Sequence, residues 1–219
     1  DTHGIWWAAF YVSFIINFPH FIHSYQLLYP GLTKRLENPQ TLTGTKIRLW
    51  LAAFIAPLCL LCLYIAALWV EDARLLGKAA NVMYFLVGWH YIKQGFGVFN
   101  VLSIRKGLFF NGFEKQLLLV NSYIVWLTTW MHFNKALYEH QEWGIYYQTL
   151  NMPDDFVYVG YILMAISTVA TCVMLFKKFR RDKDISFNGL TAYILAAYAW
   201  IPLFQHGGYL LLSFVPALH

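Results

Sequence analysis

Apolar residues occur along the chain in six long blocks, which polar and charged segments separate. A helix rises 1.5 Å per residue, so about 20 apolar residues cross the hydrocarbon core of a bilayer. Six segments meet this requirement: residues 4–29, 49–70, 79–104, 116–138, 156–176 and 185–214. The segments between them are short, so neighbouring helices are expected to run antiparallel. The pattern therefore predicts an all-α fold, a polytopic membrane helix bundle of six transmembrane helices that forms a single domain over residues 1–219.

The basic residues are distributed unevenly over the connecting segments. The connections after the first, third and fifth blocks hold twelve of them: Lys34, Arg35, Lys46, Arg48, Arg105, Lys106, Lys115, Lys177, Lys178, Arg180, Arg181 and Lys183. The other two connections hold three: Arg74, Lys78 and Lys135. Because connections rich in Lys and Arg stay in the cytoplasm, both ends of this chain are predicted on the non-cytoplasmic side. The expected location is a bacterial inner membrane.

Composition agrees with this assignment and narrows the possible functions. The 219 residues are 59% hydrophobic and 12% charged, about half the charge of an ordinary soluble domain. The net charge of +5 forms no basic stripe outside the apolar blocks, so a nucleic-acid partner is not expected. The chain starts at Asp1 without an initiator Met, so six helices are expected as a minimum.

Histidine is the dominant ionisable residue inside the predicted spans. His20, His23, His90, His132 and His206 lie within them or at their edges, whereas no Asp or Glu does. Such residues are costly in hydrocarbon and indicate function. The lack of carboxylates excludes a ferritin-like di-iron bundle, which needs Glu-x-x-His pairs. One HxxH and several single histidines also fit poorly with the histidine boxes of membrane desaturases and with the paired haem histidines of a quinol-type cytochrome b.

Neutral imidazoles from four helices are suitable ligands for iron, copper or zinc. We therefore predict a metal site formed by His20, His23, His90, His132 and His206, in which iron is the expected metal. Two arrangements remain open: one central site, or two clusters in which His132 and His206 lie apart from the other histidines. Nearby polar residues are the expected hydrogen-bond partners of the rings: Asn17, Tyr25, Gln94, Asn134 and Gln205.

The stretch 88–100, "GWHYIKQGFGVFN", is the second candidate region. Lys93 and Gln94 follow His90 on the same helical segment, and we predict that they orient substrate or bound oxygen in catalysis. Gly95 and Gly97 lower helix propensity, so each is either a packing notch or a slot for a flat ligand. Aromatic residues near these motifs suggest a groove for a long apolar substrate.

The three cysteines do not indicate redox chemistry. Cys59 and Cys62 form a CxxC, but leucines surround it, and Cys172 is also in an apolar block. A reactive CxxC needs an accessible thiolate of low pKa. We therefore predict that the cysteines are buried packing residues without a disulfide framework.

The layout of histidines resembles that of the Brp/Blh membrane family, which cleaves β-carotene with iron. The similarity concerns an early Pro19-His20, a middle His90 and a late His206. It implies a non-haem iron enzyme that acts on a lipid. The segments "NFPHF" and "WHYIKQGFG" also resemble motifs of uncharacterised bacterial multi-pass proteins, which imply no function.

The leading hypothesis is a histidine-ligated membrane metalloprotein, a non-haem iron oxidoreductase or oxygenase. Its substrate would be a membrane lipid or another apolar small molecule that enters from the bilayer. One alternative is a haem- or chlorophyll-binding subunit of an electron-transfer or photosynthetic complex, which the glycines near His90 and His206 favour. Another is a non-enzymatic transporter or structural subunit with membrane-protein partners.

Overall fold

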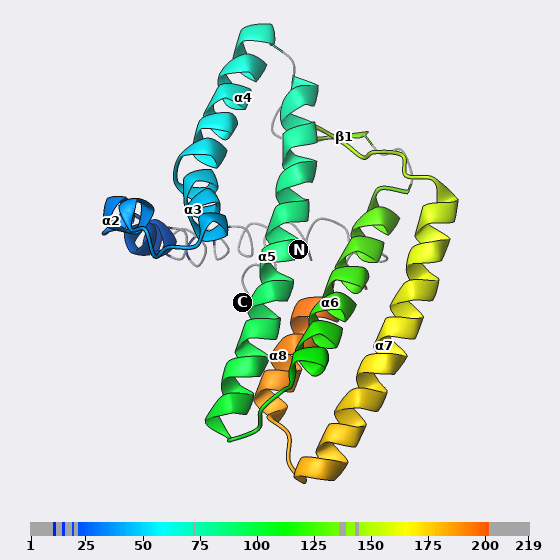
Figure 1. Ribbon diagram of the computed structural model, residues 1–219. Coiled ribbons are helices and arrows are strands. Elements are labelled where there is room, and N and C mark those ends of the chain that lie inside the picture. Colours follow the sequence, from blue (N-terminus) through cyan, green and yellow to red (C-terminus); the bar gives the residue numbers. More distant parts are fainter. Residues whose placement is uncertain are drawn as a thin grey trace. The chain divides into compact units, whose positions relative to one another are not determined.

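A computed structural model describes residues 11, 15, 19, 22–71, 73–135, 139–142 and 145–201. Its elements are α2 (Leu32–Glu37), α3 (Thr43–Trp50), the π-helix η1 (Leu51–Ile55), α4 (Ala56–Val70), α5 (Ala73–Arg105), α6 (Gly112–Phe133), strands β1 (Glu139–Glu142) and β2 (Ile145–Gln148), α7 (Asp154–Asp182) and α8 (Phe187–Tyr198). The two strands form an antiparallel hairpin in which Glu139 faces Gln148. The described part is thus almost entirely helical (Figure 1). This confirms the predicted all-α class.

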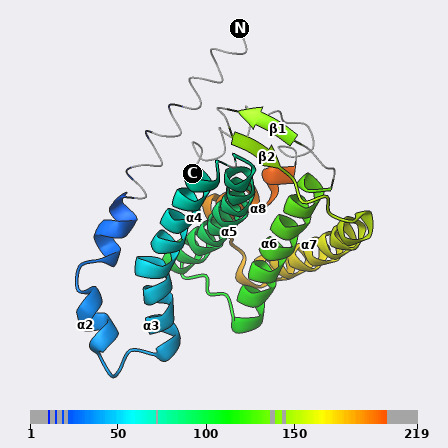
Figure 2. The ribbon, with the colours of Figure 1, turned by 90° about the horizontal axis from the view of Figure 1, so that it is seen from above.

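The described residues fall into two units, one that ends at Leu76 and one that begins at Gly77. The first unit contains α2, α3, η1 and α4, and the second contains most of α5 together with α6, the hairpin, α7 and α8. Figure 2 shows the same elements along a perpendicular view. The prediction of a single domain over residues 1–219 stays a prediction.

In the first unit, a proline explains why one turn of the helix is widened. Pro57 has no N–H, so the carbonyl of Ala53 lacks its usual partner four residues later. The helix adopts π geometry over Leu51–Ile55, and the hydroxyl of Tyr29 donates to the freed Ala53 carbonyl at 2.9 Å. The Tyr29 hydroxyl thus replaces the N–H that Pro57 lacks, and the helical stretch continues from α3 through η1 into α4.

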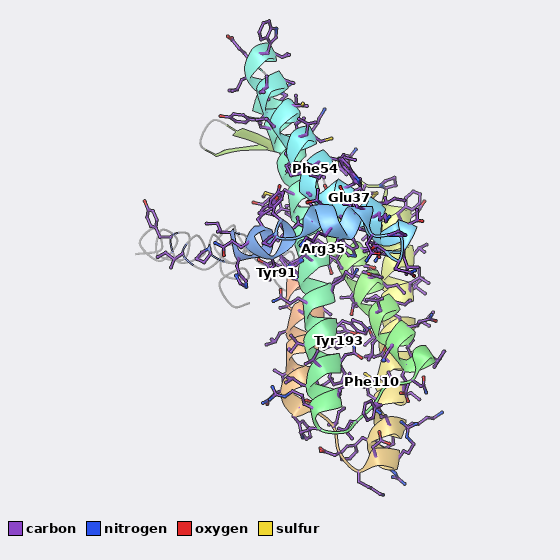
Figure 3. The ribbon with its side chains drawn as sticks, turned by 60° about the vertical axis from the view of Figure 1, so that its left-hand side comes forward. Arg35, Glu37, Phe54, Tyr91, Phe110 and Tyr193 are labelled. Carbon is purple, nitrogen blue, oxygen red and sulfur yellow. The ribbon has the colours of Figure 1, made fainter. Side chains whose placement is uncertain are left out.

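In the second unit, aromatic residues of α5 and α8 form the core. Phe99 is fully buried and contacts the rings of Phe110 and Tyr193 at centroid distances of 5.0 and 5.8 Å. Two turns earlier on α5, Tyr91 stacks on Trp200. The Trp200 ring in turn meets the Trp126 ring of α6 edge-on at a centroid distance of 5.0 Å. Figure 3 labels Tyr91, Phe110 and Tyr193 of this unit. These contacts fix how α5, α6 and α8 pack.

Both ends of α6 are set by asparagine side chains. At the start, Asn111 accepts from the Glu114 backbone N–H, and the Glu114 carboxylate accepts from the Asn111 N–H, which forms a capping box. At the end, Asn134 donates to the Trp130 carbonyl and accepts from Asn81 of α5 and from the N–H of Leu150. The helix therefore stops at Phe133, whereas the sequence predicted a span to residue 138.

The other predicted spans differ in how far the structure supports them. Segment 49–70 lies within the helical stretch Thr43–Val70, segment 156–176 within α7, and segment 79–104 within α5. Segment 185–214 begins as α8, and its residues after 201 lie outside the described part, as does most of segment 4–29. The hairpin and α2 were not predicted.

Among the described residues, two helical stretches are long and apolar enough to cross a membrane. They are Thr43–Val70, with 28 residues, and Asp154–Asp182, with 29 residues. Their large apolar side chains are mostly exposed; Leu60 and Ile166, for example, are 64% and 61% exposed. The core helix of a soluble protein would bury such side chains, so these helices are suited to an apolar surrounding.

Candidate functional site

The predicted metal ligands lie in different parts of the structure. His20 and His206 lie outside the described residues. His23 belongs to the helical segment 22–28 of the first unit, where it is exposed. His90 of α5 and His132 of α6 belong to the second unit. Of the predicted ligands that the structure describes, only His90 and His132 lie in the same unit, so only their positions can be compared directly.

His132 has the more defined surroundings. Its Nδ1 atom is 2.7 Å from the hydroxyl of Tyr161 on α7, and the ring is half-buried. A cavity of about 10 Å³ adjoins the ring, lined also by Thr129, Met164 and Ile201. This volume suits roughly one water molecule or one ion.

The Tyr161 hydrogen bond determines which nitrogen of His132 can bind a ligand. If the imidazole carries its proton on Nδ1 and donates to the tyrosine oxygen, the lone pair of Nε2 is free for a metal or a proton. A metal-bound histidine generally has its second nitrogen held in this way. In that tautomer His132 has the arrangement of an oriented ligand, and its partner is Tyr161 and not the predicted Asn134.

Asn134 instead serves the packing of α5 against α6. Its side chain bonds to Asn81, to the Trp130 carbonyl and to Leu150, and the indole N–H of Trp130 donates to Asn81 at 3.1 Å. The Asn134 backbone carbonyl also accepts from Met152. These bonds occupy the side-chain oxygen and amide of Asn134, so it is a structural residue next to His132.

A groove between α5 and α6 includes Trp89, the residue before His90, but His90 itself does not line it. The groove has a volume of about 430 Å³ and is lined by Phe85, Leu86, Trp89, Tyr123, Trp126 and Leu127. The lining is almost entirely apolar and includes four aromatic rings, which suits a lipid-soluble molecule. The sequence suggested an aromatic groove formed by other residues: Tyr11, Phe18, Phe21, Tyr25, Tyr91, Phe96 and Phe99. Phe18 and Phe21 lie outside the described residues, and none of the others lines this groove.

Lys93 and Gln94 follow the groove residue Trp89 by about one turn of α5. The Lys93 ammonium lies 4.9 Å from the ring centroid of Trp89, a groove residue, which is within cation–π distance. Lys93 is exposed, whereas Gln94 is half-buried. The structure thus places a positive charge against Trp89, one of the groove residues, and the predicted catalytic roles of Lys93 and Gln94 stay predictions.

His90 and His132 do not lie at the same level of the bundle. The Asn81–Asn134 hydrogen bond aligns α5 with the antiparallel α6. His90 follows Asn81 by nine residues and His132 precedes Asn134 by two, so their Cα atoms differ by about 10 Å along the axis. Each ring contacts a tyrosine: Tyr91 for His90 and Tyr161 for His132. Within the described ranges, no three His, Cys, Asp or Glu side chains gather as a metal-binding group.

The glycines near His90 differ in their roles. A Cβ on Gly88 would lie 2.2 Å from the Trp126 ring, and one on Gly95 would lie 2.3 Å from the Ala196 methyl. Both are packing notches that neighbouring helices fill, so neither offers a slot for a flat ligand. At Gly97 a Cβ would meet nothing within 4 Å.

A buried polar network between α6, α7 and α8 was not predicted. The amide nitrogen of Asn121 donates to the hydroxyls of Tyr193 and Tyr198, and its oxygen accepts from Ser167 and Thr168. Tyr193 donates onward to the Leu118 carbonyl at 2.8 Å. The described hydrogen bonds satisfy both ends of the Asn121 amide, so this network ties three helices together.

The exposure of the three cysteines contradicts another prediction. Cys59, Cys62 and Cys172 are free thiols, as expected, but all three are exposed and not buried packing residues. They lie on apolar helices whose outer faces are themselves exposed, so a buried environment inferred from neighbouring leucines was wrong.

Comparisons of the chain with protein-family models, with curated protein sequences and with solved structures found no match.

Proposed function

We propose that the chain is an integral membrane protein with six spanning helices, both ends on the non-cytoplasmic side of a bacterial inner membrane. The exposed apolar surfaces of Thr43–Val70 and α7 support this proposal. Helices α5 and α6, with 33 and 22 residues, are also long enough to span. The positive-inside distribution of Lys and Arg supports the orientation.

Within this bundle, we propose a histidine-bound transition metal, with iron the expected ion, that serves an oxidoreductase reaction. The observation that carries the proposal is the 2.7 Å contact between Tyr161 and Nδ1 of His132, beside a cavity of ion size. It orients Nε2 as a ligand atom, because the other nitrogen is already paired. In sequence, His206 follows Ile201 of the same cavity by five residues, which makes it the first further ligand to test.

The proposed substrate is a lipid-soluble molecule that enters the groove between α5 and α6. The groove walls are apolar, and Lys93, whose ammonium lies over the Trp89 ring, supplies one positive charge for a polar group of the substrate. The Brp/Blh resemblance agrees with this substrate class and stays a hypothesis.

Elemental analysis and a visible spectrum of the purified protein test the metal proposal. We expect one or two equivalents of a transition metal per chain and no Soret band. Single alanine substitutions of His20, His23, His90, His132 and His206 identify the ligands, because a true ligand variant loses most of the metal. A Soret band would replace the proposal by the haem-binding alternative. Absence of stoichiometric metal would leave a transporter or structural subunit.

A further inference from the structure

A cavity of about 530 Å³ lies between α6 and α7, away from His132 and from the aromatic groove. One end is cationic, with Lys177, Lys178 and Arg181, and the other is apolar, with Leu117, Ala170 and Val173. Its volume lies in the usual range of ligand pockets. A ligand that fits this cavity must itself have one anionic and one apolar end.

The three cations differ in how far neighbouring residues neutralise them. Lys178 is buried and donates to Asp182 and to the Phe109 carbonyl, both at 2.7 Å, above the Phe110 ring. Its charge is therefore compensated. Lys177 is exposed at the cavity wall and forms none of the described ion pairs or hydrogen bonds. It is the cation most available to a ligand.

Arg181 uses some of its hydrogen-bond donors on neighbouring carboxylates. Its guanidinium forms three described hydrogen bonds, two to Asp182 and one to Glu114, so some of its five N–H donors remain. Hydrogen bonds from Arg181 and Lys178 lower the pKa of Asp182 to about 2, which keeps this carboxylate ionised beyond the apolar segment 156–176. The pair with Asp182 thus holds Arg181 in place at the cavity.

Glu114 is the one carboxylate in the cavity lining, and both of its oxygens accept hydrogen bonds from protein groups. One of its oxygens accepts from the Asn111 N–H in the capping box, and the other accepts from Arg181 at 3.4 Å. Three cations and one carboxylate line the cavity. Asp182, outside the lining, pairs with Lys178 and Arg181, so a surplus of one positive charge is left for an anion.

The apolar end extends along α7 toward the middle of the predicted span. Ala170 precedes Lys177 by seven residues, which is about 10 Å along the helix. Val173 is exposed beside it, and Leu117 faces it from α6. This length matches the upper carbons of an acyl chain whose headgroup lies at Lys177.

We infer that this cavity binds an anionic phospholipid, with the phosphodiester at Lys177 and Arg181 and one acyl chain along Leu117, Ala170 and Val173. The inference goes beyond the metal proposal and depends only on its membrane part, since the cavity lies at the end of α7 that the basic residues assign to the cytoplasmic surface. Anionic lipids are common at that surface and are attracted by such basic clusters. A free phosphate lacks the chain that the apolar end requires.

Native mass spectrometry of the purified protein tests this inference. The protein is titrated with phosphatidylglycerol, phosphatidylcholine or glycerol phosphate. We expect retained phosphatidylglycerol, weaker phosphatidylcholine and no bound glycerol phosphate. Lys177→Gln weakens phosphatidylglycerol binding about fivefold, as removal of one interfacial cation predicts. Ala170→Phe, which fills the apolar end, weakens it by about fourfold for each CH₂ group displaced.

Arg180→Gln is the matched control. Arg180 is exposed on the same helical turn but outside the cavity lining, and its removal changes the net charge equally. It leaves phosphatidylglycerol binding within about twofold of wild type. Equal losses for Lys177→Gln and Arg180→Gln, or equal binding of both lipids, would overturn the inference. Metal analysis of the same samples distinguishes a failure of the lipid inference from a failure of the metal proposal, because none of these substitutions replaces a predicted metal ligand.

Discussion

Asn121 shows how much one buried side chain contributes to this bundle. Its side chain is fully buried, yet both ends of the amide are hydrogen-bonded to residues of α7 and α8. A buried polar group costs free energy unless it is paired, so removing Asn121 also leaves its partners short of a hydrogen bond.

We expect Asn121→Leu to lower the free energy of unfolding by about 1–3 kcal/mol, measured as a loss of thermal stability in detergent. Thr171→Val is the control on α7. The Thr171 hydroxyl is buried without a hydrogen-bond partner among the described residues, so its replacement by a methyl group is neutral or stabilising. Equal destabilisation by both variants would contradict the role assigned to Asn121.

Tyr161 is expected to tune the metal affinity of His132. We predict that Tyr161→Phe lowers metal affinity about 10–100-fold, since the Nδ1 atom of His132 loses its hydrogen-bond partner. Chelator competition measures the affinity. Tyr158→Phe, an exposed position three residues earlier on α7, leaves the affinity unchanged. If both variants keep wild-type affinity, Tyr161 does not orient a metal ligand.

At the residue scale, the sequence indicated His132 but not its partner. Tyr161 is 29 residues away, and the contact depends on how α6 and α7 pack. An i, i+3 or i, i+4 pattern describes only one helix, so it cannot provide that information. For the same reason Asn121 was not recognised, because its partners lie 46 to 77 residues further along.

At the scale of elements, close approach of helices sets strict limits on side-chain size. Gly88 lies against the Trp126 ring, and Gly95 against Ala196 of α8. Small residues at such positions let helices come together in a membrane, where lipid gives no hydrophobic force between them.

We predict opposite effects for alanine at neighbouring glycines of α5. Gly88→Ala and Gly95→Ala destabilise by about 1–3 kcal/mol or more, because the added methyl overlaps Trp126 or Ala196. Gly97→Ala stabilises by up to about 1 kcal/mol, because its site is open and alanine favours the helix. Thermal unfolding in detergent distinguishes the three, and destabilisation by Gly97→Ala would contradict this packing.

Apolar patterning predicted where helices lie better than where they end. Segments 49–70 and 156–176 match helices because their composition is uniform. Segment 116–138 was too long, since Asn134 bonds to Asn81 and Leu150 and thereby ends α6. The π-helical turn before Pro57 has a local cause and follows from the missing N–H, although the partner Tyr29 is 24 residues away.

At the scale of the whole molecule, orientation in the bilayer is the main prediction. After replacement of the three exposed native cysteines, single cysteines are introduced at Lys115 and at Leu150, both exposed. An impermeant maleimide should label Leu150→Cys in intact spheroplasts and Lys115→Cys only after permeabilisation, because basic connections stay inside. Reversed labelling would contradict the orientation, and labelling of both in intact cells would contradict a span between them.

X-ray absorption at the metal edge of the purified protein reports which atoms surround the metal. We predict at least three imidazole nitrogens about 2.0–2.2 Å from the metal, with one of them lost in His132→Ala. A protein without bound metal, or a metal shell without imidazole, would contradict it.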